Sequence, residues 1–263
     1  MLIDHTLWDG VVDKVQVAIE RIRQFEPPEG YYLAFSGGKD SCVVLDLVKR
    51  SGVKYDAHYN LTTVDPPELV HFIRREHPEV AVHRPKESMW QLIARKGDLP
   101  TRNARWCCSI LKEGGGAGRT VITGVRWAES ARRSKRRMIE ICNQQAGKNY
   151  LHPIIDWSHD EVWEYIHANK IPYCSLYDEG FKRIGCILCP MTRKAAQEAE
   201  RWPKIFAMYQ FACEKGFPVM KERKGRKNGK PITWKNAREW FEWWAFERDG
   251  KEKEDPDQTV MFE

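Results

Sequence analysis

Two glycines and a lysine interrupt the chain at "SGGKDS", residues 36–41, between the apolar run "YYLAF" and a segment with helical spacing. Glycine adopts the backbone angles of a tight turn and lets backbone amides approach an anion closely. A helix that begins directly after the turn points its positive end at the same place. Lys39 adds a full charge, and Ser36 and Ser41 add hydroxyl donors. These residues predict a phosphate-binding loop rather than a plain surface turn.

Asp40 follows the lysine and occupies the first turn of the expected helix, where a carboxylate is favourable. Two roles are open to it: orienting Lys39, or binding a magnesium ion. The sequence of residues 36–41 differs from the G-x-x-x-x-G-K-[ST] phosphate loop.

Four of the eight cysteines form two close pairs, Cys107 with Cys108 in "RWCCSILK" and Cys186 with Cys189 in "GCILCP". Four thiolates suit either a zinc ion or an iron–sulfur cluster. Adjacent cysteines favour the cluster, because paired zinc ligands are usually separated by two to four residues. Spacing alone leaves both metals open. The other cysteines are predicted to be buried packing residues: Cys42, Cys142, Cys174 and Cys213.

Strand-like and helical segments alternate along the first part of the chain. Short aromatic or β-branched runs predict strands at residues 31–35, 54–60, 80–84 and 119–124. Helical spacing predicts helices at residues 11–25, 40–52, 66–77, 86–97 and 158–170. This alternation predicts an α/β fold with a doubly wound, mostly parallel sheet, whose ligands bind at the carboxyl ends of the strands.

The character of the sequence changes near residue 190, where tryptophan-rich helical segments begin. We therefore expect a nucleotide-binding α/β domain with an N-terminal helix at residues 1–190, followed by a helical C-terminal region with a basic loop at residues 191–263. The tryptophans of this region either pack in a core or stack on nucleic-acid bases. Helical spacing of Trp240 and Trp244 favours the core.

The chain has 263 residues, 42% of them hydrophobic and 30% charged, as is typical of a globular protein. No segment reads as a secretory signal or a membrane span, so we expect a cytoplasmic protein without a membrane partner. The formal charge of +6 fits a phosphate- or sulfate-bearing partner. The basic runs at residues 132–137 and 221–230 are either nucleic-acid contacts or solvated loops. The oligomeric state is left open.

"SGGKDS" resembles the pyrophosphate-binding loop, or PP-loop, of the adenine nucleotide alpha-hydrolase superfamily. This superfamily includes N-type ATP pyrophosphatases and phosphoadenosine phosphosulfate (PAPS) reductases. The resemblance implies that one set of residues contacts the phosphates or sulfate of ATP, PAPS or adenylyl sulfate (APS): Ser36, Gly37, Gly38, Lys39, Asp40 and Ser41. Lys39 and Asp40 are predicted catalytic residues, together with Arg126.

The cysteine pattern resembles the same family. A Cys-Cys pair followed roughly eighty residues later by Cys-x-x-Cys is similar to the [4Fe-4S] adenylyl-sulfate reductases, and here 77 residues lie between Cys108 and Cys186. "TGVRWAESARR" and the segment 153–190 also resemble family elements, so the resemblance spans roughly residues 30–195. It implies a [4Fe-4S] cluster on Cys107, Cys108, Cys186 and Cys189, with Lys112 near the cluster.

Further nucleotide contacts follow from the same resemblance. Arg126, Glu129 and Arg132 are expected on the far side of the nucleotide pocket, where arginine binds sulfate or phosphate in a bidentate manner. Thr62 and Asp65, in "LTTVDPPE", are expected in the loop after the second predicted strand.

One family feature is missing from the sequence. Family reductases attack sulfur with a cysteine in a Glu-Cys-Gly-x-His-like motif near the C-terminus. No cysteine follows Cys213, and "FACEKG" lacks the Gly-x-His. The sequence thus favours ATP hydrolysis to AMP and pyrophosphate for sulfur transfer, as in the ATP pyrophosphatases of DNA phosphorothioation and the cluster-dependent tRNA thiolases.

Two alternatives remain: a PAPS or APS reductase that uses an external thiol, and a non-enzymatic nucleotide-binding redox regulator. Besides the adenine nucleotide, the candidate partners are nucleic acid and a protein that donates sulfur or electrons.

Overall fold

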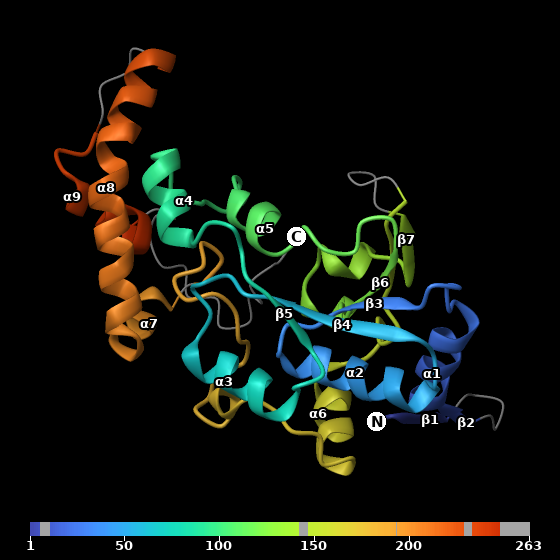
Figure 1. Ribbon diagram of the computed structural model, residues 1–263. Helices are drawn as coiled ribbons and strands as arrows, with labels where there is room; N and C mark the ends of the chain where they lie inside the picture. Colours follow the sequence, from blue (N-terminus) through green and yellow to red (C-terminus); the bar gives the residue numbers. More distant parts are fainter. Residues whose placement is uncertain (6–10, 142–146, 193, 229–232, 248–263) are drawn as a thin grey trace.

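The computed structural model describes residues 1–263 except 6–10, 142–146, 193, 229–232 and 248–263. A six-stranded sheet runs through its centre (Figure 1). In spatial order the strands are β5 (Ala81–His83), β4 (Tyr55–Asn60), β3 (Tyr31–Ala34), β6 (Thr120–Ile122), β8 (Asn149–Leu151) and β7 (Ile139–Ile141). Only the edge strand β7 pairs antiparallel with its neighbour. The predicted α/β fold with a mostly parallel sheet is confirmed.

Helices cover both faces of this sheet. On the lower side in Figure 1 lie α1 (Lys14–Gln24), α2 (Lys39–Ser51), α3 (Pro67–Glu76) and α6 (His159–Ala168). On the upper side lie α4 (Met89–Lys96) and α5 (Trp106–Leu111). The helix ends that the sequence predicted from capping residues are confirmed. Gly52 ends α2 in the left-handed conformation, and Ser158 forms a capping box with Glu161 at the start of α6.

The first helix is shorter than predicted. Residues 11–13 form β2 (Val11–Asp13), which pairs antiparallel with β1 (Ile3–His5), and α1 begins only at Lys14. The Asp13 side chain accepts hydrogen bonds from the amides of Val15 and Gln16, so it caps the helix at this point. The two β-branched valines before it favour the extended conformation.

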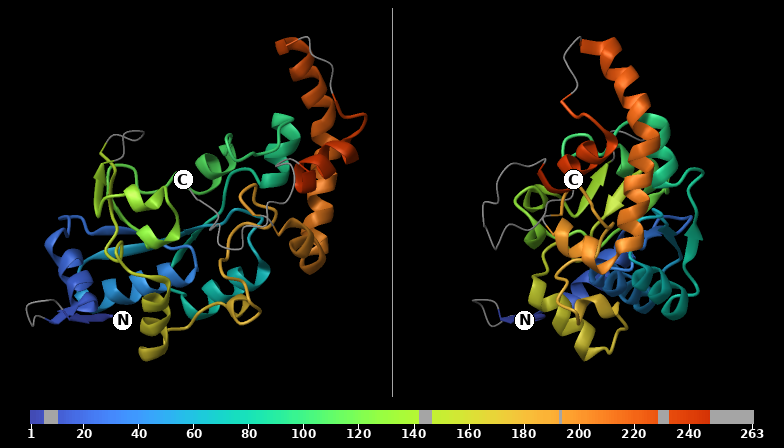
Figure 2. Two further views of the ribbon diagram at one scale, coloured as in Figure 1. Left: turned by 180° about the vertical axis from the view of Figure 1, so that it is seen from behind. Right: turned by 90° about the vertical axis from the view of Figure 1, so that its left-hand side faces the viewer.

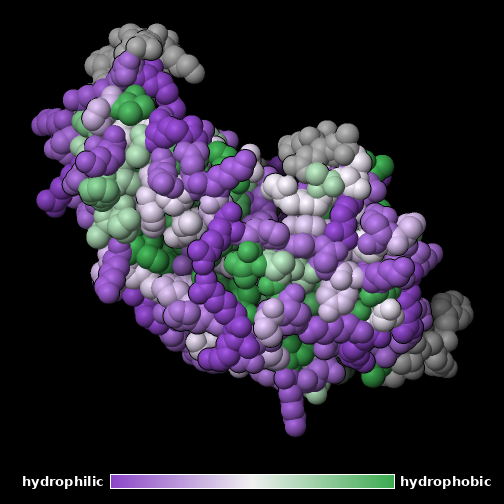
Figure 3. Space-filling view, in the orientation of Figure 1, coloured by the Kyte–Doolittle hydropathy of each residue, from purple (hydrophilic) through white to green (hydrophobic). Residues whose placement is uncertain are grey.

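The C-terminal helices stand at one end of the molecule, where α8 (Pro203–Asn228) packs against α4 and α9 (Figure 2). Around it lie α7 (Ala195–Arg201), α9 (Ala237–Glu242) and a π-helical turn at Trp243–Glu247. Trp240 and Trp244 are buried, and the indole of Trp244 donates to the carbonyl of Pro100 at 2.6 Å. Their predicted place in the core is confirmed. The face seen in Figure 3 is mostly hydrophilic, with apolar side chains gathered near its middle.

Cysteines outside the two pairs also lie where the sequence predicted. Cys42, Cys174 and Cys213 are buried, whereas Cys142 lies outside the described residues. The side chains of residues 224–230, most of the second basic run, are likewise not described. None of the helices in the described ranges is both long enough and apolar enough to cross a membrane.

Candidate functional site

The turn at residues 36–38 lies at the carboxyl end of β3, where the order of the strands changes direction. The chain leaves β3 through α2 and returns in β4 on one side, whereas β6 lies on the other side of β3. Loops on the two sides of such a switch point diverge and leave room for a ligand. The fold therefore places the predicted phosphate loop at its most favourable binding position.

Gly37 explains why the turn needs a glycine. Its φ is +72°, and a Cβ at this position would lie 2.7 Å from the Cδ1 atoms of both Leu69 and Ile73 on α3. A Cβ at this position would force these side chains to shift, so glycine, which also tolerates the positive φ, allows the loop to pack closely against α3.

The two serines of the loop bind each other and the backbone. Their hydroxyl oxygens are 3.2 Å apart, and the Ser41 hydroxyl donates to the Gly38 carbonyl at 2.8 Å. The amide of Gly38 donates in turn to the Ser36 hydroxyl at 3.3 Å. These bonds fix the turn at the start of α2, whose positive end attracts anions.

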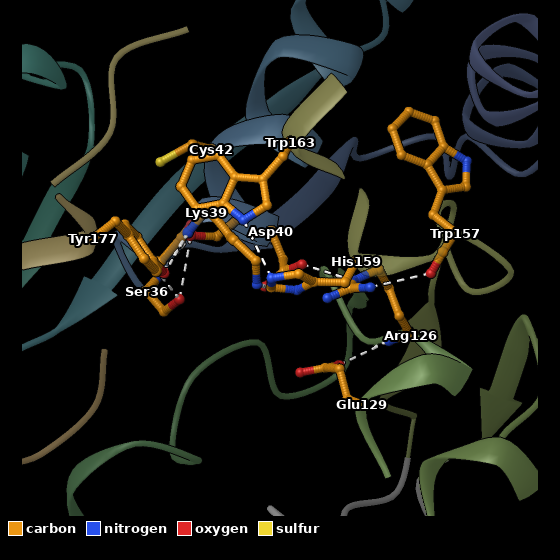
Figure 4. A network of polar contacts seen from close by, with 12 residues as sticks. Ser36, Lys39, Asp40, Cys42, Arg126, Glu129, Trp157, His159, Trp163 and Tyr177 are labelled. Carbon is orange, nitrogen blue, oxygen red and sulfur yellow. Dashed lines mark hydrogen bonds and ion pairs between the residues drawn. The ribbon is translucent and has the colours of Figure 1, made fainter. Parts of the chain in front are cut away.

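Asp40 joins the two principal cations of the site (Figure 4). Its Oδ2 accepts from Lys39 Nζ at 2.9 Å, and its Oδ1 accepts from Arg126 Nε at 2.7 Å. Burial works against the charge of Asp40, but Lys39 and Arg126 keep the pKa of its carboxyl below the ordinary value. Both carboxylate oxygens of Asp40 therefore take part in orienting Lys39 and Arg126.

Arg126 is held from three directions in a site where its side chain is only 2% exposed. Besides its bond to Asp40, one terminal nitrogen donates to the Trp157 carbonyl at 3.1 Å, and its amide donates to Glu129 at 2.9 Å. Glu129 pairs with Arg133, and Arg132, which was expected on the far side of the nucleotide pocket, is exposed. Arg133, the first residue of the short 3-10 helix η2 (Arg133–Lys135), was not predicted, because the sequence of two adjacent arginines does not indicate which one is the more buried.

Two aromatic residues and a histidine complete the surroundings of the loop (Figure 4). The Lys39 amide donates to the hydroxyl of Tyr177, in the 3-10 helix η3 (Ser175–Tyr177), at 3.0 Å. The Trp163 indole donates to Nε2 of His159 at 3.3 Å. Partial desolvation, with Lys39 and Arg126 nearby, lowers the pKa of His159. Nothing in their sequence spacing marked Tyr177 or His159 as neighbours of the loop.

The four paired cysteines line a single cavity beside this site. Its lining residues are Thr62, Met89, Pro100, Cys107, Cys108, Leu111, Lys112, Cys186, Cys189, Pro190 and Tyr209. They come from α4, α5, α8 and the loops after β4, α4 and η3, so distant parts of the chain converge here. The predicted grouping of Cys107 and Cys108 with Cys186 and Cys189 is present in space, although no three His, Cys, Asp or Glu side chains in the described part of the chain are placed to hold a metal ion.

Thr62 and Asp65 belong to the cysteine cavity more than to the phosphate loop. The thiol of Cys186 donates to Thr62 Oγ1 at 3.4 Å, and the Thr62 amide donates to Asp65 at 2.7 Å. Lys112 lines the same cavity. Burial opposes its charge, yet the neighbouring Cys186 and Asp65 raise its pKa above the ordinary value. Its predicted place near the cysteines is thus the one observed.

The profile of the phosphoadenosine phosphosulfate reductase domain matches residues 30–192, more than half of the chain. The chain belongs to this family.

Relatives of this PAPS reductase domain include proteins of assigned and unassigned activity. The chain is 30% identical over 185 residues to an uncharacterised protein of Methanocaldococcus jannaschii. This match covers 66% of the chain and 45% of that protein. The chain is 29% identical to the adenosine 5'-phosphosulfate reductase of Oceanobacillus iheyensis, over 64% of this chain and 75% of that enzyme. The chain spans less than half the length of the first two relatives that it matches.

A crystal structure of a PAPS reductase from Candida auris in complex with phosphate aligns with the PAPS reductase domain described here. The TM-score is 0.49 and the sequence identity 23%, and the alignment covers 64% of this chain and 87% of the other.

Proposed function

We propose that this PAPS reductase domain binds an adenine nucleotide at the loop 36–41 and uses ATP to activate a group for sulfur transfer. One observation carries the proposal: Asp40 holds Lys39 and Arg126 together at the amino-terminal end of α2. Two buried cations beside a glycine turn form a preorganised site for the phosphates of a nucleotide. Family membership is consistent with nucleotide chemistry of this kind.

In the proposed reaction an acceptor oxygen attacks the α-phosphorus of ATP. The bond from this phosphorus to the bridging oxygen breaks, and pyrophosphate leaves with the electron pair. Lys39 and the positive end of α2 stabilise the charge that develops on the pyrophosphate. Arg126 is fixed by the Trp157 carbonyl and by Asp40, so it offers its charge without reorganising. A sulfur nucleophile then displaces AMP from the activated group.

The donor set of the cysteine cavity fits the [4Fe-4S] cluster that the sequence predicted. Cys107, Cys108, Cys186 and Cys189 would hold it, with Lys112 providing a nearby positive charge. A single tetrahedral zinc ion would require all four sulfurs at about 2.3 Å from one point. A cluster instead binds one thiolate at each of its irons, and four cysteines line this cavity. When bound, it would supply sulfur or electrons to the activated group.

A second candidate is the reduction of an adenylated sulfate, favoured by the similarity to adenosine 5'-phosphosulfate reductases. In this reaction a thiolate of an external dithiol attacks the sulfur, and AMP leaves with the electron pair. The second thiolate of the donor then displaces sulfite, and the donor is left as a disulfide, so two electrons pass to sulfur. The nucleotide would occupy the same loop. The two candidates differ in the bond that breaks. In the first it joins the α-phosphorus to the bridging oxygen, and in the second it joins the sulfur to the oxygen of AMP.

Anaerobic incubation with ATP, APS and PAPS in separate reactions, each with and without thioredoxin, tests the two candidates. Pyrophosphate release from ATP supports activation chemistry, and thioredoxin-dependent sulfite release supports the reductase. If neither product forms but an adenine nucleotide binds tightly, the remaining function is a nucleotide-binding redox regulator. Lys39→Ala should weaken nucleotide binding sharply. Unchanged affinity in that variant would remove the loop from the site.

A nucleic-acid partner stays a separate prediction, to be tested by adding RNA and DNA as sulfur acceptors. The basic run 132–137 follows the Arg126 loop directly, so such an acceptor would lie close to the nucleotide.

A further inference from the structure

The turn between Cys186 and Cys189 has a strained backbone. Its third residue, Leu188, has a φ of +54°, in the left-handed region that residues with a Cβ rarely adopt. The Leu188 side chain is buried, and the amide of Cys189 donates to the carbonyl of Cys186 at 3.2 Å. Both thiols line the cavity that Cys107 and Cys108 share. Because this backbone conformation is unfavourable by itself, contacts from outside the turn are needed to hold it.

Glu198, on α7, supplies two such contacts. Its Oε2 accepts from the Leu188 amide at 2.7 Å, and its Oε1 accepts from the Thr192 hydroxyl at 3.0 Å. The Thr192 amide donates in turn to the carbonyl of Cys189 at 2.8 Å. One carboxyl group therefore connects the strained residue of the turn with the segment that follows it.

Two further contacts fix Ile187, the residue before the strained position. Its amide donates to the Val64 carbonyl at 2.8 Å, and its carbonyl accepts from the Tyr209 hydroxyl at 3.1 Å. The turn is thus held by the loop after β4 and by the two helices α7 and α8. Glu198 and Tyr209 both lie beyond residues 30–192, which match the family domain, so their roles have to be inferred from these contacts.

We propose that Glu198 is a positioning residue for Cys186 and Cys189, which holds the turn between them in the conformation that presents both thiols to an inorganic cofactor. The inference rests on the proposed function, because it assigns a role toward the cluster that the cysteine cavity is proposed to hold. Groups that orient metal ligands without touching the metal strongly affect how well the metal is retained. Without the carboxyl group, the Leu188 amide loses its acceptor, and the turn loses a contact that opposes its relaxation.

The first measurement follows the loss of iron. Wild type, Glu198→Ala, Glu198→Gln and the control Glu200→Ala are purified anaerobically, and the transfer of iron to an excess of a ferrous-iron chelator is timed. The affinity for the metal should fall roughly 10- to 100-fold in Glu198→Ala, which is seen as a correspondingly faster transfer. Glu198→Gln should lie between, since its carbonyl oxygen can still accept from the Leu188 amide. Glu200 is exposed on the same helix, so Glu200→Ala should match the wild type.

The second measurement applies whether or not a cofactor is bound. In the same anaerobically purified proteins, the alkylation of each cysteine by iodoacetamide is timed and read from its peptide by mass spectrometry. Glu198→Ala should accelerate the alkylation of Cys186 and Cys189, because the released turn exposes both thiols to the reagent. Cys213, which is fully buried in α8, should keep its wild-type rate. Its rate would rise if Glu198 only stabilised the fold, because the fold as a whole would then open more often.

The inference fails in three distinguishable ways. Unchanged iron transfer and unchanged alkylation of Cys186 and Cys189 in Glu198→Ala would mean that the turn holds its conformation without α7. Equal acceleration at Cys213 would mean that the substitution opens the fold as a whole. An equal effect of Glu200→Ala would reduce the result to the loss of a charge from α7. If the wild type carries no iron, the proposed cluster fails first, and the alkylation rates then decide whether Glu198 holds the turn.

Discussion

Arg126 donates to Asp40 over 2.7 Å, although 86 positions separate the two residues in the chain. The bond connects the first turn of α2 with the loop after β6, which are the two sides of the switch point in the sheet. The phosphate loop is therefore completed by a residue that the neighbouring strand delivers. Lys39, Asp40 and Arg126 come together only when β3 and β6 pair.

Asp40→Asn should destabilise the fold as well as the nucleotide site. Removing the carboxylate leaves Arg126, at 2% exposure, without its charged acceptor. Breaking a buried pair in this way costs about 3 kcal/mol or more. We expect a loss of this size in the free energy of unfolding, measured by urea denaturation without nucleotide. The matched control is Asp160→Asn, an exposed carboxylate in the first turn of α6, which should cost less than about 1 kcal/mol. Equal midpoints for wild type and Asp40→Asn would show that the Asp40–Arg126 pair contributes nothing to the fold.

The sequence predicted the loop 36–41 and the grouping of the four cysteines, because both depend on residue types at short, recognisable spacings. It could not predict Tyr177, Arg133 or His159 as neighbours of the loop, because their positions follow from how η3, η2 and α6 pack. The strands β7 and β8 were also missed. Among the described residues no α-helix lies between β6 and β8, so the alternation of strands and helices gave no signal for them.

The C-terminal region supplies a side chain to the cysteine cavity, although its sequence differs in character from the first part of the chain. A change of character near residue 190 predicted a separate part of the chain, and that division stays a prediction. Tyr209 of α8 nevertheless lines the cysteine cavity and donates to the Ile187 carbonyl at 3.1 Å. A helix can supply one side chain to a distant site without any signal in its own sequence, since only the packing of α8 on α4 brings it there.

Gly37→Ala should be more damaging than Gly52→Ala, although both glycines have φ near +70°. The left-handed conformation alone costs an alanine roughly 1–2 kcal/mol. At Gly52 nothing lies within 4 Å of an added Cβ, so only this strain applies. At Gly37 the added Cβ would also meet Leu69 and Ile73 at 2.7 Å. We expect a further loss of about 1–3 kcal/mol from this overpacking, together with weaker nucleotide binding. Equal stabilities of the two variants by thermal denaturation would contradict the packing of the loop on α3.

Cys186→Ala should abolish the incorporation of iron and sulfide, which are measured by metal analysis and sulfide assay after anaerobic purification. Wild type is expected to carry about four irons per chain, since four cysteines are the ligand set of a [4Fe-4S] cluster. Cys213→Ala is the control, because Cys213 is fully buried in α8 and does not line the cavity. It should keep its iron. A wild type that carries one zinc and no iron would refute the cluster.

The stability of the fold should decrease on mild acidification because of His152. This histidine is buried, lies 2.7 Å from the Thr123 hydroxyl, and has its pKa lowered to about 4, chiefly by burial. In the unfolded chain its pKa is about 6.5. Between pH 6.5 and pH 4 the unfolded state therefore binds the extra proton while the folded state does not. The free energy of unfolding then falls as the pH falls.

Linkage gives a loss of up to about 2 kcal/mol between pH 7 and pH 5 from this one group. His152→Gln keeps a polar side chain near Thr123 but cannot titrate, so its free energy of unfolding should change less over this range. His71→Gln, at an exposed position on α3, should behave like the wild type. Urea denaturation at pH 7, 6 and 5 measures all three proteins. Parallel curves for wild type and His152→Gln would show that another group controls the acid sensitivity, since only the titration of His152 distinguishes these two chains.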